Sequence, residues 1–216
     1  IYGYWRSLPR DQRPKLYRHG LSLGALNSAR SFQMFGLLED PFDGAVWAGP
    51  PFASSQWAAA TRARNPGTPI WRPQFQDGSL VRFMNQDGSS TPAGTPWGPL
   101  RAVYLQYGSD AVTFFDRDGF FREPELLKGP RPPDVSAHMT WYPVVTNLQI
   151  GLDTSLSMSA PMGFGHVYAP SDYLDAWIEA AGPGDWSPQE LDRLRRFLDD
   201  RRRAELAGDT DEAVDG

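Results

Sequence analysis

The sequence predicts an α/β domain in which helices cover both faces of a parallel sheet. Three short apolar segments are typical of buried strands, and helical segments or long connections separate them. These segments are residues 15–19, 44–49 and 101–106. Three strands are few for such a sheet, and the chain opens at Ile1 inside a helical pattern. We therefore expect an upstream segment to supply further strands.

Helices are expected between and after these strands, at residues 1–8, 25–32, 55–64, 140–158, 171–181 and 187–206. The last begins at Ser187-Pro188-Gln189-Glu190, a capping pattern with proline in the first turn. Residues 65–99 are rich in Gly, Pro, Asp and Asn, which predicts loops with one hairpin. Residues 1–206 are predicted to be the C-terminal portion of a larger domain, and residues 207–216 a disordered acidic tail.

Composition bounds the function. The net charge of −5 gives no electrostatic footprint for nucleic acid. The absence of cysteine excludes disulfides, thiolate nucleophiles and zinc sites built on sulfur, and we expect neither a metal nor a cofactor. No stretch approaches the roughly 18 consecutive apolar residues that cross a bilayer, so the chain itself is expected to be soluble.

The segment Gly20-Leu21-Ser22-Leu23-Gly24 fits the Gly-x-Ser-x-Gly pattern of a nucleophile elbow. A strand precedes it and a helix follows it, as that turn requires. Glycines are expected at both ends because side chains there would collide with neighbouring backbone. The turn exposes the serine oxygen and places the Leu23 N–H at a helix N-terminus, where it can stabilise an oxyanion.

An elbow serine needs a base and an acid, which follow it in the order Ser, acid, His. That order excludes His19, which we expect to pack beside the elbow. His166 is preferred over His138 because glycines flank it and a helix follows. Asp110 is the preferred acid because it follows residues 101–106 by a short turn. The competing acids Asp116, Asp118 and Asp153 lie further from a strand end or inside a predicted helix.

Several blocks in the same order resemble a family of actinobacterial α/β-hydrolases predicted to be membrane proteins. They include residues 13–24, 44–52 and 103–110, with Gly165-His166-Val167-Tyr168 near the end. The resemblance covers residues 1 to about 195 and implies Ser22 as nucleophile with Asp110 and His166 as partners. It also implies membrane attachment through a segment absent from this chain, so the full-length protein is expected at a membrane. One departure is Leu21, where the family usually has Glu.

The function expected from these residues is cleavage of carboxylic esters, with a small-molecule or lipid acyl ester as substrate. Aromatic residues at 114–121 and 141–142 are candidates for an apolar acyl pocket or for ordinary core packing. A transacylase would use the same three residues with an alcohol as acceptor. A catalytically silent interaction domain is the alternative from another class, because the second oxyanion donor normally comes from an earlier loop.

Overall fold

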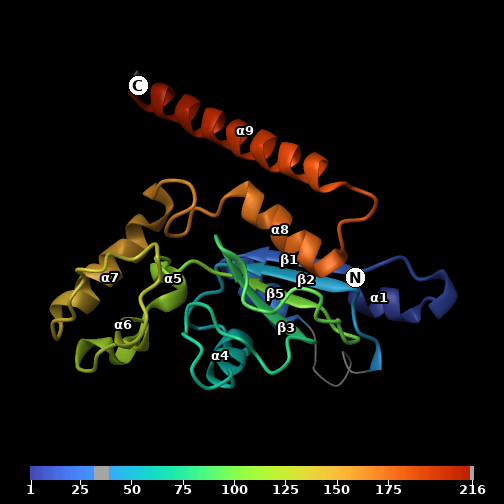
Figure 1. Ribbon diagram of the computed structural model, residues 1–216, viewed down its shortest axis with the longest axis horizontal. Coiled ribbons are helices and arrows are strands. Elements are labelled where there is room, and N and C mark those ends of the chain that lie inside the picture. Colours follow the sequence, from blue (N-terminus) through green and yellow to red (C-terminus); the bar gives the residue numbers. More distant parts are fainter. Residues whose placement is uncertain (32–38, 215–216) are drawn as a thin grey trace.

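The computed structural model describes residues 1–31 and 39–214, without the side chains beyond residue 208. Within this part, the chain forms a five-stranded, mostly parallel sheet in the order β1-β2-β5-β3-β4, surrounded by helices (Figure 1). The strands are β1 (Tyr17–Leu21), β2 (Gly44–Ala48), β3 (Val81–Asn85), β4 (Gly88–Ser89) and β5 (Ala102–Leu105). The predicted α/β class is therefore confirmed.

Strand β2 lies at the centre of the three strands predicted from the sequence. It pairs in parallel with β1 on one side, where Leu21 is opposite Ala48, and with β5 on the other, where Ala48 is opposite Leu105. Parallel strands place their carboxyl ends at one edge of a sheet, which is where ligands bind in open α/β folds. Ser22 and Asp110 follow β1 and β5, so the fold brings both to this edge, as predicted.

Two hydrophobic clusters cover opposite faces of the sheet. Alternate residues of β2 point to opposite sides, as the strand period of two requires. Ala45 and Trp47 join helices α2 (Leu23–Arg30) and α4 (Ser55–Arg62) on one face, whereas Val46 and Ala48 pack with helix α8 (Pro170–Ala181) on the other. Helix α9 (Pro188–Val214) lies over α8, further from the sheet (Figure 1).

Shorter elements complete the described part of the chain. They are α1 (Tyr2–Ser7), η1 (Arg10–Gln12), α5 (Ala111–Phe114), η2 (Arg117–Phe120), α6 (Glu125–Lys128), α7 (Val145–Leu156) and η3 (Ser157–Ser159). Among the described residues, no helix is both long enough and apolar enough to cross a membrane.

Three sequence expectations need correction. The predicted loop region 65–99 contains β3, which pairs in parallel with β5 as a full member of the sheet; the expected hairpin is the β3–β4 turn. The expected helix at 140–158 starts later, at Val145. Helix α9 continues to Val214, so most of the predicted disordered tail has a helical backbone; residues 215 and 216 lie outside the described residues, as does Phe32 of the second predicted helix.

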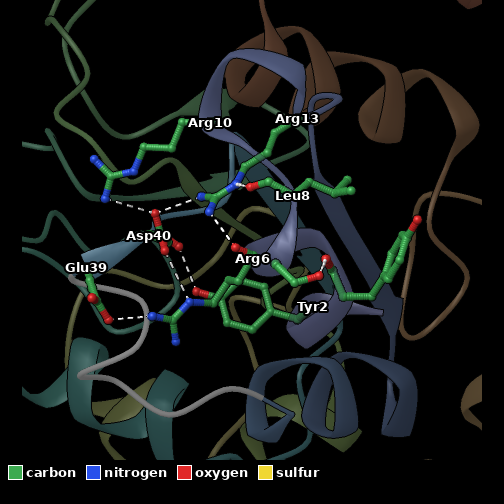
Figure 2. Close-up of polar contacts among 9 residues, drawn as sticks. Tyr2, Arg6, Leu8, Arg10, Arg13, Glu39 and Asp40 are labelled. Carbon is green, nitrogen blue, oxygen red and sulfur yellow. Dashed lines mark hydrogen bonds and ion pairs between the residues drawn. The ribbon is translucent and has the colours of Figure 1, made fainter.

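A carboxylate before β2 holds the N-terminal segment against the domain (Figure 2). Asp40 forms ion pairs with Arg6, Arg10 and Arg13, and the Arg13 guanidinium also donates hydrogen bonds to the carbonyls of Arg6 and Leu8. The hydrogen bond from Arg13, followed by that from Arg6, holds the pKa of the Asp40 carboxyl below its usual value, against the opposing effect of burial. Helix α1 and the η1 turn are therefore tied to the segment that leads into β2.

Replacing Asp40 with Asn should lower the melting temperature most at neutral pH. A carboxyl whose pKa is lower in the folded state stabilises that state above its unfolded pKa of about 4, and this contribution is lost as the pH falls through the folded value. The difference in melting temperature between wild type and Asp40→Asn should therefore shrink from pH 7 to pH 3. Exposed Asp11, replaced in the same way, is the matched control. A difference that stays constant with pH would contradict the role of these ion pairs.

Candidate active site

Ser22 occupies a strained turn between β1 and α2. Its backbone angles are φ 56° and ψ −122°, in a region that residues with a side chain rarely adopt. The Ser22 N–H donates a 3.0 Å hydrogen bond to the carbonyl of Ala48, and the Ser22 carbonyl accepts one from Leu26 N–H at 3.1 Å. The last bond of the β1–β2 ladder and the first bond of α2 thus fix the serine from both sides.

The two elbow glycines have different roles. A Cβ at Gly20 would overlap the backbone of Gly24 and Ala25, because the helix folds back directly over the end of β1. A Cβ at Gly24 would meet open space. The expectation that both positions need glycine is therefore correct for Gly20 and wrong for Gly24, whose Cα faces away from the strand at the start of α2.

Asp110 is fully buried at the start of α5 and accepts five hydrogen bonds. The backbone N–H groups of Val112 and Thr113 donate to Oδ1, at 2.9 and 3.4 Å. Oδ2 accepts from the Thr113 hydroxyl at 3.1 Å, the Tyr168 hydroxyl at 2.8 Å and Nδ1 of His166 at 2.8 Å. Such a set of donors offsets the cost of burying a carboxylate.

His166 connects this carboxylate to the elbow. The ring is 4% exposed and lies against Gly49, where an added Cβ would come within 2.6 Å of Cε1. Gly49 has a φ of +50° and directly follows Ala48, the residue that accepts the Ser22 hydrogen bond. Nδ1 faces Asp110, and within the described residues Nε2 has no hydrogen-bond partner. The structure thus joins two of the three predicted residues directly and brings the third to the same end of β2, without a hydrogen bond between Ser22 and His166.

The other histidines and acids have different environments. His19 lies in β1 with Nδ1 at 3.1 Å from the Val46 carbonyl, and burial lowers its pKa. His138 is exposed. Asp116 caps the η2 turn through the N–H of Asp118, and Asp153 lies on α7. His19 therefore packs beside the elbow as expected.

Tyr168 is a neighbour of the candidate acid that the sequence analysis did not single out. Its hydroxyl donates to Asp110 and accepts from the backbone N–H of Tyr107, and its ring stacks on that of Tyr107 at 4.2 Å. Burial, reinforced by the Asp110 charge, raises the pKa of Tyr168 well above its usual value, which keeps the hydroxyl a donor. The signal was its spacing of two residues from His166, which places both side chains near one carboxylate.

Ser109 fixes the loop that carries His166. Its hydroxyl donates to Oδ2 of Asp134 at 2.7 Å and accepts from the N–H of Gly165 at 2.9 Å. Its backbone N–H also donates to Asp134, at 2.8 Å. The residues on either side of the β5 turn, Ser109 and Asp110, therefore each hold one of the neighbours Gly165 and His166.

Three cavities lie near this edge. A groove of about 490 Å³ is lined by Leu21 and His166, with α8 and α9 along its length. A cavity of about 400 Å³ lies between Ser109 and η3, and a smaller one of about 180 Å³ contains Phe114 beside Asp110. The predicted aromatic acyl pocket at 114–121 and 141–142 is therefore not the groove that reaches His166, and Phe114 belongs mainly to the core. Among the described residues, no three His, Cys, Asp or Glu side chains form a group that would hold a metal ion.

Comparison with known families agrees with this geometry. Residues 1–194 match the family described as the alpha/beta-hydrolase family. Because the match covers most of the chain, this protein belongs to that family. No match to the chain is found among curated proteins, and none among solved structures.

The unequal glycines give a paired prediction. Gly20→Ala should destabilise the domain by about 2 kcal/mol or more, because the new methyl group has no room and the surrounding backbone must shift. Gly24→Ala should be neutral or stabilise by up to about 1 kcal/mol, because alanine favours the helix and its methyl group faces solvent. Chemical denaturation of both variants measures this, and equal losses would contradict the packing described for the elbow.

Proposed function

We propose that this member of the alpha/beta-hydrolase family is a serine hydrolase that cleaves carboxylic esters with Ser22, His166 and Asp110. The observation that carries the proposal is the buried Asp110–His166 hydrogen bond, with the second ring nitrogen left unpartnered beside a strained serine. A buried base held in one orientation by a carboxylate is the arrangement that activates a hydroxyl nucleophile.

In the proposed reaction, Ser22 Oγ attacks the acyl carbonyl carbon while Nε2 of His166 takes the hydroxyl proton. Asp110 keeps the other proton on Nδ1 and stabilises the imidazolium that forms. The tetrahedral intermediate expels the alcohol, which takes the proton from Nε2, and leaves an acyl ester on Ser22. Water then attacks this ester, gives its proton to Nε2 and releases the acid as Ser22 recovers its proton.

The oxyanion of the tetrahedral intermediate needs donors close to Ser22. Leu23 is the first residue of α2, and its N–H belongs to the group at a helix start that has no partner within the helix. We propose that this N–H is one oxyanion donor, helped by the positive end of the helix dipole.

Acceptor and location form further parts of the proposal. The same acyl-enzyme would serve a transacylase if an alcohol replaced water, and product analysis in the presence of alcohols separates the two. Association with a membrane through a segment outside this chain, with a lipid acyl ester as substrate, follows from the resemblance noted in the sequence, as does an actinobacterial source.

Variants of the nucleophile and the acid test the proposal directly. Ser22→Ala should lower kcat/KM for an activated ester by at least about 10⁴-fold, because the three residues act as a unit. Asp110→Asn should lower it by roughly 10²- to 10⁴-fold, because the amide favours the wrong histidine tautomer. Initial rates with 4-nitrophenyl acetate give both values.

Labelling by a fluorophosphonate probe is the companion measurement. The wild type should be labelled on Ser22, and Ser22→Ala should not. A control serine replaced in the same way, exposed Ser55 at the start of α4, should leave both labelling and turnover intact. A folded wild type that neither reacts with the probe nor turns over esters would favour the silent interaction domain instead.

Tyr168→Phe tests whether the acid is held in place by its neighbour. The variant keeps the stacked ring but removes one donor from Asp110, so kcat should fall by roughly tenfold with little change in KM. Tyr107→Phe is the matched control: its hydroxyl contacts Asp172 and Ala169 rather than Asp110. Equal losses of kcat in two variants of similar stability would contradict a specific role for Tyr168.

A further inference from the structure

The groove of about 490 Å³ has one end at the candidate nucleophile. Leu21, the residue before Ser22, and the base His166 both line it. From there it runs between α8, which contributes Tyr173 and Trp177, and α9, which contributes Leu198. A substituent on a carbonyl attacked by Ser22 would therefore have the groove immediately beside it.

The lining of the groove is almost entirely apolar. Met158, Leu174 and Leu198 supply flexible aliphatic surface, and the rings of Tyr173 and Trp177 are held by contacts with His19 at 5.6 and 5.8 Å. Arg202 is the one formally charged side chain in this lining, and its guanidinium pairs with Glu205. The surface therefore suits a hydrocarbon and offers few partners to a polar group.

The neighbouring cavities are poor alternatives for the same substituent. The cavity of about 400 Å³ is lined by Leu156 and Phe164 but also by four serine and acidic side chains, and neither Leu21 nor His166 lines it. The cavity of about 180 Å³ lies on the far side of Asp110, beside Phe114. A site volume of 300 to 1,000 Å³ is about what a small organic ligand occupies, and the α8–α9 groove falls within it.

We propose that the α8–α9 groove binds the linear apolar acyl chain of the ester substrate, with Leu21 and Leu198 as specificity-determining residues. This inference rests on the proposed function, and it names the substrate class as fatty acyl esters rather than short-chain or charged esters. Leu21 at the elbow fits this class, because a carboxylate there would lie against the first methylenes of the chain without a partner.

A chain-length series of 4-nitrophenyl esters, each below its micelle concentration, tests the proposal. Burial of each methylene is worth about 0.8 kcal/mol, which corresponds to a rise in kcat/KM of about fourfold per methylene. The octanoate ester should therefore exceed the butanoate ester by roughly 10- to 100-fold. A wild type that hydrolyses both esters equally well, or prefers the short one, overturns the proposal.

Two variants on one helix separate the groove from general effects of α9. Leu198→Gln keeps the side-chain length and helix propensity but places an amide in the groove, so the octanoate-to-butanoate ratio should fall at least about fivefold. Leu194→Gln is the matched control: it lies one turn earlier on α9, is half-buried like Leu198, and lines a different surface depression with Phe197. Melting temperatures of both variants check that they are folded, and an equal fall in both ratios overturns the proposal.

Direct binding keeps this test separate from the chemistry. Titration of the Ser22→Ala variant with decanoate, followed by calorimetry, should show binding that acetate does not compete for and that Leu198→Gln weakens by at least about fivefold. If no ester is hydrolysed and Ser22 is not labelled, the proposed function fails, yet decanoate binding with this variant pattern still supports the groove. Absence of decanoate binding overturns the groove whether or not esters are cleaved.

Discussion

A carboxylate with no exposed surface is stable only where enough donors surround it, and Asp110 collects five of them from two separate parts of the chain. Val112 and Thr113 are its immediate neighbours, whereas His166 and Tyr168 come from the loop before α8. The geometry of the loop is therefore coupled to the requirement that this charge be satisfied. Loss of either partner would leave a buried anion with fewer donors, which is why the acid and the base are positioned together.

Strand β2 supplies the platform for this arrangement. Every residue of β2 is buried, and the strand separates β1, which carries the elbow, from β5, which leads to Asp110. The gap between the two is spanned above Gly49 by the His166 ring, which needs a neighbour without a side chain. The same helix, α8, that seals this face of the sheet also forms one wall of the apolar groove. Core packing and the proposed acyl site thus share residues, so variants within α8 would disturb both, whereas α9 offers positions that touch the groove alone.

The sequence by itself determined the features that depend on neighbours in the chain. The elbow is a strand, a tight turn and a helix within about a dozen residues, and the steric need for Gly20 arises from residues four and five positions ahead. The Ser187–Glu190 cap forms as predicted, with Ser187 and Glu190 exchanging hydrogen bonds, because capping is equally local. The parallel order of β1, β2 and β5 also followed, because apolar strands joined by helices have few alternative arrangements.

Tertiary structure decided what depends on distant partners. Strand β3 was missed because Arg82 interrupts its apolar pattern; the guanidinium is buried by an ion pair with Glu179 and by the ring of Trp97 at 3.8 Å, neither of which its own segment reveals. Tyr168 gained its position only when the loop before α8 met β5. The path of the groove, likewise, needed α9 to fold back over α8. Local sequence fixes backbone turns through steric contacts a few residues apart, whereas buried polar groups and cavities are defined by side chains that meet only after the chain has folded.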